Sequence, residues 1–120
     1  MKLKNRIFYI IATIIWMAVI FYLSSIPDLK SSFSTPIDTI LRKMAHMTEY
    51  GILYLLLYRS FDGFKQKTTI SIMIAIMYAI SDEWHQGFVE GRMSAYTDVI
   101  IDSIGILIFF VIQKNTLRKK

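Results

Sequence analysis

The sequence predicts an all-α fold, an integral membrane four-helix bundle with both termini in the cytoplasm. Three observations support this prediction. Apolar residues make up 54% of the 120 residues, and the mean hydropathy is +0.44, which exceeds what soluble domains usually show. These residues are grouped in blocks long enough to cross a membrane. The charged residues lie mainly towards the ends of the blocks, as membrane topology requires.

The first predicted span covers residues 7–23 and contains no charged residue. At about 1.5 Å per residue it crosses most of a ~30 Å hydrocarbon core. A basic segment precedes it, so the region also resembles a secretory signal peptide. The apolar run is long for a signal peptide, however, and no A-x-A cleavage site follows it. We therefore interpret this span as a retained transmembrane helix.

Three further spans are predicted within a single domain, residues 1–120. They cover about residues 40–61, 68–84 and 96–113. Asp62-Gly63 separates the second span from the third, and Gly87 and Gly91 mark a loop before the fourth.

Lysine and arginine residues predict the orientation of the bundle. Ten of the 14 fall in the N-terminal segment, in the connection between the second and third spans, or in the tail: Lys2, Lys4, Arg6, Arg59, Lys65, Lys67, Lys114, Arg118, Lys119 and Lys120. The positive-inside rule places these segments, and so both termini, in the cytoplasm. The same positions argue against nucleic acid as the partner of this +5 chain, and membrane lipids are the expected partners.

Ionisable residues inside the spans form the candidate site. Such residues usually face a bundle interior or a water-filled cavity, because charge is expensive in lipid. Lys43, His46 and Tyr50 share one face of the second span. Asp98 and Asp102 share a face of the fourth span with Gly105, which would let another helix approach closely. Counted from the outer ends, the polar residues of three spans lie about 5–10 Å deep, in one layer.

Acid–base chemistry and anion binding are both expected of this layer. His46 is the candidate general acid or base, with Glu83 and Asp98 as its catalytic partners. Arg92 and Lys43 are candidates for holding a phosphate or carboxylate. The candidate ligand-binding residues are Lys43, Tyr50, Asp82, Gln86, Arg92 and Asp102.

Other interpretations of these residues remain open. Ion pairs such as Lys43 with Asp98 would fasten helices together without further function. His46 with Glu49 would offer two metal ligands, but no repeated histidine motif accompanies them, so we expect neither a metal nor another cofactor. A thiolate site is impossible because the chain has no cysteine. His85 is interpreted as a surface histidine at a helix end.

Three motifs in order resemble the VanZ-like family of bacterial membrane proteins. The first is Ser24-Ser25-Ile26-Pro27 after an apolar run, and the second is Lys43-x-x-His46-x-x-x-Tyr50. The third consists of Asp82-Glu83-Trp84-His85-Gln86, Gly91-Arg92, and Asp98, Asp102 and Gly105. It resembles D-E-x-x-Q, G-R and D-x-x-x-N-x-x-G, with Asp102 at the position where the family often has Asn.

The resemblance implies a role in the bacterial cell envelope, associated with resistance to the glycopeptide teicoplanin. Two functions are compatible with it. In the first, an outward-facing pocket binds an anionic lipid, a lipid-linked cell-wall precursor or a lipoglycopeptide. In the second, the chain is a membrane-embedded hydrolase or transferase acting on an envelope lipid, with His46 as its acid–base group. We favour binding, because no recognisable motif places a nucleophile.

Overall fold

Four α-helices follow one another in the computed structural model, which describes residues 2–25, 36–88 and 96–118. They are α1 (Leu3–Ser24), α2 (Pro36–Ser60), α3 (Lys67–Gln86) and α4 (Tyr96–Arg118). The described part of the chain contains no β-strand. The prediction of an all-α, four-helix fold is therefore confirmed.

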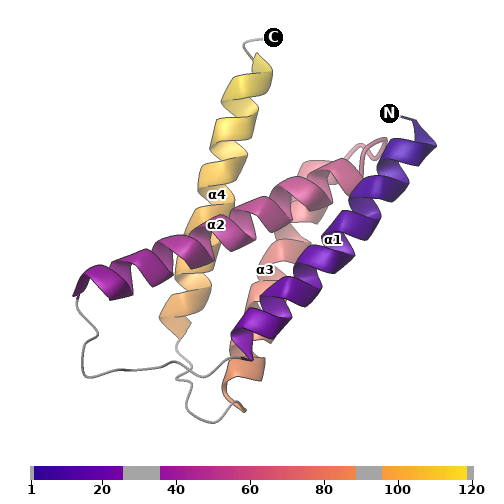
Figure 1. The fold of residues 1–120 in the computed structure, drawn as a ribbon. Helices are drawn as coiled ribbons and strands as arrows, with labels where there is room; N and C mark the ends of the chain where they lie inside the picture. The colour runs from indigo at the N-terminus through magenta and orange to yellow at the C-terminus, as the bar shows by residue number, and fades with distance from the viewer. Residues whose placement is uncertain (1, 26–35, 89–95, 119–120) are drawn as a thin grey trace.

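The helices run alternately in opposite directions, so that both termini and the α2–α3 turn lie at one end of the bundle (Figure 1). The Arg6 Nε–H donates a hydrogen bond of 3.1 Å to the carbonyl oxygen of Ser60, which fixes the start of α1 beside the end of α2. We call this the terminal end, and the end formed by Ser24, Gln86 and the start of α4 the distal end.

The α2–α3 turn depends on a residue with a positive φ angle. Gly63 has φ +97°, a conformation that costs glycine little and other residues much more. Across the turn, Lys67 Nζ lies 3.1 Å from Asp62 Oδ1. This hydrogen bond from Lys67 lowers the pKa of Asp62.

Helix α4 extends beyond the apolar run that predicted it. The predicted span ends at Gln113, and the helix continues to Arg118. The basic side chain of Arg118 in the last turn interacts favourably with the negative end of the helix dipole, which stabilises this extension. Gln113 also belongs to the packed bundle, because its Oε1 accepts a hydrogen bond of 2.6 Å from the Tyr54 hydroxyl.

Helix α2 contacts each of the other three helices and supplies half of the buried apolar core. Tyr50, Leu53 and Tyr54 are completely buried along it. It meets α4 closely because Gly105 lies against the backbone of Met47, and Gly51 lies against the Phe109 ring. Close approach at Gly105 agrees with the sequence-based expectation.

Helix α1 exposes most of its apolar side chains. Phe8 is 64% exposed and Tyr22 is 68% exposed. Among the helices searched in the described residues, α1 is the one long and apolar enough by itself to cross a membrane, with a mean hydropathy of 2.3. The later helices carry the ionisable residues described above.

Candidate functional site

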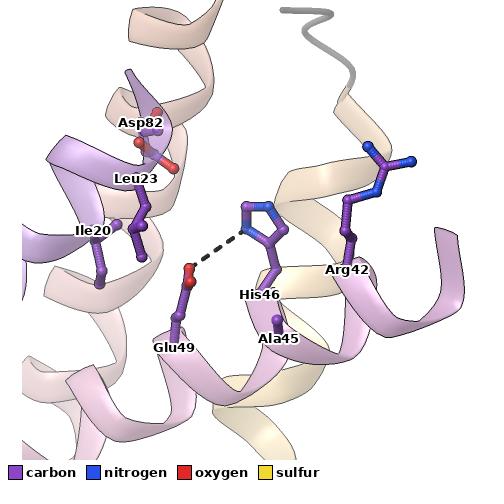
Figure 2. A pocket seen from close by; sticks show the side chains of 8 residues that line it. Ile20, Leu23, Arg42, Ala45, His46, Glu49 and Asp82 are labelled. Carbon is purple, nitrogen blue, oxygen red and sulfur yellow. Dashed lines mark ion pairs between the residues drawn. The ribbon is translucent and has the colours of Figure 1, made fainter. Parts of the chain in front are cut away.

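A cavity of about 170 Å³ opens near the distal end, between the end of α1, the first half of α2 and the end of α3 (Figure 2). Its lining combines apolar and ionisable side chains. The residues that line it are Ile20, Leu23, Ser24, Arg42, Ala45, His46, Glu49 and Asp82. A cavity of this size suits a small polar group and not a drug-sized molecule, which needs at least about 300 Å³.

Helical spacing explains the contribution of α2. Arg42, His46 and Glu49 lie at i, i+4 and i+7, which places them on one side of the helix. Lys43 is exposed and is not one of the lining residues. Tyr50 is fully buried in the core. The structure therefore brings His46 into the cavity with Arg42 as its basic neighbour, in place of the Lys43 that the sequence suggested.

The His46 imidazole lies between two carboxylates from different helices. Its Nδ1 is 3.8 Å from Glu49 Oε2 and 3.8 Å from Asp102 Oδ1. Both distances suit an ion pair when His46 is protonated, but they exceed hydrogen-bond length. Nδ1 is buried and has no hydrogen-bond partner within the described residues. A small rotation of the ring, or one bridging water, would let it exchange a proton with either carboxylate.

Asp82 and Gln86 face each other one turn apart on α3. The Gln86 Nε2–H donates to Asp82 Oδ2 over 3.3 Å, and both side chains are buried. The other oxygen, Asp82 Oδ1, is buried and accepts no hydrogen bond from the described part of the chain. The buried Tyr50 hydroxyl is a close neighbour of Asp82 and also lacks a hydrogen bond among the described residues, so the two groups share one unsatisfied polar position beside the cavity.

Asp102 stands at the centre of a group of carboxylates. Asp82, Asp98, Glu49 and Glu83 all lie within electrostatic reach of it. Asp102 and Glu83 are only 3% and 6% exposed, and Asp98 is half-buried near the start of α4. The structure thus gathers these carboxylates around Asp102, and two of them, Asp102 and Glu49, lie beside His46.

Arg92, the predicted anion-binding residue of the outer loop, lies outside the described residues. Among the residues that the structure does describe, no group of three His, Asp or Glu side chains is arranged to hold a metal ion.

Sequence reasoning missed Arg42, interpreted His85 as a surface residue, and identified Ser24 only through the motif that it shares with Ser25. Arg42 was detectable, because it lies one turn before His46. Ser24 belongs to the Ser24-Ser25 motif, and its buried Oγ lines the cavity without a hydrogen-bond partner among the described residues.

His85 is half-buried and not a free surface histidine. Its Nε2 lies 3.0 Å from the Ser25 Oγ, and its ring stacks on Phe21 with centroids 4.3 Å apart. It therefore fastens α1 to α3 beside the cavity. No local pattern signals this contact, because 60 residues separate the partners.

The exposed apolar α1 and the ionisable cavity at one end of a helical bundle indicate a small membrane protein. Sequence comparison gives the particular family. The chain belongs to the VanZ/LLP1 family, whose model matches residues 8–117, nearly the whole chain. This match confirms the resemblance carried by the three motifs. No curated protein and no solved structure matches the chain.

Proposed function

We propose that this chain is a multi-pass protein of the bacterial cytoplasmic membrane that binds the headgroup of an envelope amphiphile in its distal cavity. The amphiphile is an anionic lipid, a lipid-linked cell-wall precursor or a lipoglycopeptide, and binding lowers susceptibility to glycopeptides such as teicoplanin. Membership of the VanZ/LLP1 family supports this proposal. The exposed apolar surface of α1 supports the membrane location.

Charge distribution supports the orientation in which the cavity faces outwards. Arg6, Arg59 and Lys65 lie in or beside the terminal end, and the buried carboxylates lie towards the distal end. With the terminal end in the cytoplasm, the bundle obeys the positive-inside rule and the cavity lies near the outer membrane surface.

One observation carries the binding proposal: buried polar atoms that make no hydrogen bond within the described residues border the cavity. Ser24 Oγ, His46 Nδ1 and Asp82 Oδ1 are all buried, and none of them makes a hydrogen bond within the described residues. Each such atom costs about 1–3 kcal/mol if it stays unsatisfied. A polar ligand that enters the cavity would satisfy them, with Arg42 at the edge to hold its phosphate.

The test measures teicoplanin susceptibility and envelope lipid composition in cells making the wild type, Arg42→Ala, His46→Ala or Arg92→Ala. Lys65→Ala removes a positive charge outside the cavity and serves as the control. We expect the three site variants to lose protection while Lys65→Ala keeps it, at equal amounts of protein in the membrane. Full protection by every site variant would exclude the pocket as the active feature.

A membrane-embedded enzyme is the second candidate function, and one observation favours it. Ser24 Oγ and His46 line the same cavity, so the motif serine is available as a nucleophile. Ser24 Oγ would attack an ester carbonyl while His46 takes its proton and passes it to the leaving alcohol, and water would then release the acyl group. Glu49 and Asp102, each 3.8 Å from His46 Nδ1, would support the imidazolium in place of the Glu83 and Asp98 that the sequence suggested, and Arg92 would stabilise the oxyanion.

Covalent labelling separates the enzyme from the binding protein. A fluorophosphonate probe should label the wild-type enzyme and leave Ser24→Ala unlabelled. It should also fail to label His46→Ala, because the serine then lacks its base. An unlabelled wild type, together with an unchanged lipid profile in cells, would favour the binding protein.

A further inference from the structure

The distal cavity contains more negative than positive groups. Two carboxylates, Glu49 and Asp82, line it together with one guanidinium, Arg42. Asp98 and Glu83 lie within electrostatic reach of Asp102, so this group of carboxyls favours a positive neighbour over a further negative one. A headgroup that pairs its anionic phosphate with a positive nitrogen is therefore better matched to this lining than one that carries negative charge alone.

Two buried oxygens give this attraction a defined position. Asp82 is 5% exposed, and its Oδ1 has no hydrogen-bond partner in the described part of the chain. Ser24 is 2% exposed, and its Oγ also has no hydrogen-bond partner in the described part of the chain. Both residues line the cavity. An ammonium group has three N–H donors and no acceptor, so it matches a carboxylate and a hydroxyl oxygen that both need donors.

The positive and negative groups lie on different sides of the cavity. Figure 2 shows Asp82 and Arg42 on opposite sides, with Glu49 and His46 between them. Arg42 belongs to an exposed turn of α2, and Asp82 is buried at the end of α3. A ligand with separated charges would therefore direct its anionic part towards Arg42 and its cationic part towards Asp82 and Glu49.

From this arrangement we propose that the distal cavity takes a phosphate–ammonium zwitterion of the ethanolamine phosphate type, carried by a membrane lipid. The ammonium lies against Asp82, Glu49 and Ser24, and the phosphate lies against Arg42 and His46. This inference rests on the proposed binding function and specifies its amphiphile as a zwitterionic lipid in place of an anionic one. The lining residues Ile20 and Leu23 and the exposed neighbour Tyr22 offer apolar contact to the attached acyl chains. They favour a lipid over free ethanolamine phosphate.

The experiment titrates the full-length protein in detergent with phosphatidylethanolamine, phosphatidylglycerol or soluble ethanolamine phosphate, and follows bound ligand by native mass spectrometry. We expect the wild type to bind phosphatidylethanolamine at least tenfold more tightly than phosphatidylglycerol, and both more tightly than the soluble compound. Asp82→Asn and Glu49→Gln keep the side-chain shape and should abolish the preference by weakening phosphatidylethanolamine binding about tenfold. Asp62→Asn, at the terminal end, is the control and should keep it.

Each other outcome has a distinct meaning. Equal binding of the two lipids, unaffected by Asp82→Asn and Glu49→Gln, would overturn the zwitterion and leave the proposed binding function intact. Absence of binding by either lipid would overturn the zwitterionic lipid as the ligand, whereas the susceptibility test of Arg42→Ala and His46→Ala decides the proposed function separately. Tight binding of soluble ethanolamine phosphate alone would support the zwitterion and refute its membrane source. The thermal unfolding temperature of each variant shows whether it is folded. If Asp82→Asn unfolds at a clearly lower temperature than the wild type, the binding preference of Glu49→Gln alone decides the question.

Discussion

His46 Nδ1 of α2 lies 3.8 Å from Asp102 Oδ1 of α4, and this contact joins the candidate site to the most closely packed part of the bundle. The Asp102 oxygen is buried and lacks a hydrogen bond among the described residues. Four other carboxylates lie within its electrostatic reach. Asp102 is therefore unfavourably placed for a negative charge.

Removal of the Asp102 charge should stabilise the fold. Asp102→Asn keeps the shape of the side chain and relieves repulsion from the other carboxylates, and we expect a gain of about 1 kcal/mol in the free energy of unfolding. Thermal unfolding in detergent measures the change. Asp98→Asn, in a half-buried position, is the comparison and should gain less. A clear loss of stability in Asp102→Asn would show that its pair with protonated His46 outweighs the repulsion.

Close packing of α2 against α4 should make Gly105 intolerant of a side chain. A Cβ atom on Gly105 would lie 2.6 Å from the Met47 Cα atom, which is backbone and cannot rotate away. We expect Gly105→Ala to cost about 1–3 kcal/mol of stability, as overpacking commonly does. Gly51→Ala is the matched control, because its Cβ meets the Phe109 ring, a side chain that can shift. Gly51→Ala should destabilise the fold less than Gly105→Ala, as measured by thermal unfolding. A larger loss of stability in Gly51→Ala would contradict this account of the contact between α2 and α4.

A tryptophan hydrogen bond holds the turn of α2 that carries Glu49. The Trp16 Nε1–H donates to the Glu49 backbone carbonyl oxygen over 2.9 Å. Trp16→Phe removes the donor and should lower the free energy of unfolding by about 1 kcal/mol. Trp84→Phe is a suitable control, because Trp84 is 72% exposed and its loss should change stability little. Equal losses of stability in Trp16→Phe and Trp84→Phe would show that the hydrogen bond from Trp16 to Glu49 does not stabilise the fold.

The contact between His85 and α1 should matter for stability and not for the choice of ligand. His85→Ala removes both the hydrogen bond to Ser25 and the stacking on Phe21, and we expect a loss of about 1–2 kcal/mol. His85→Phe keeps the stacking and should recover part of this loss. Lipid preference, measured by native mass spectrometry, should remain that of the wild type. A changed preference would place His85 in the binding site.

Membrane orientation is testable because the natural chain has no cysteine. A single cysteine introduced by Phe88→Cys, beyond the end of α3, should react with a membrane-impermeant maleimide in intact cells. Lys65→Cys, in the α2–α3 turn, should react only after the membrane is opened. Phe88 and Lys65 are both exposed, so accessibility within the protein does not separate them. The reverse labelling pattern would invert the proposed topology.

Sequence alone determined the helices and placed the ionisable residues towards one end of them. Long apolar blocks and their basic ends predict helix number and order, because these properties depend on residues that are neighbours in the chain. The i, i+3 and i+4 spacing likewise placed His46 and Asp102 on faces that point inwards. The VanZ-like motifs led to the family that the profile comparison then confirmed.

Tertiary structure decided which of these residues meet. A helix face is wide enough to contain both Lys43 and Arg42, and only packing against α1 and α3 shows that Arg42 lines the cavity. Ser24 and His85 obtained their roles in the same way, because their neighbours come from other helices and leave no periodic signal in the sequence. The sequence therefore determined the polar layer, whereas the packing of α1, α2 and α3 determined its pocket and the charges that line it.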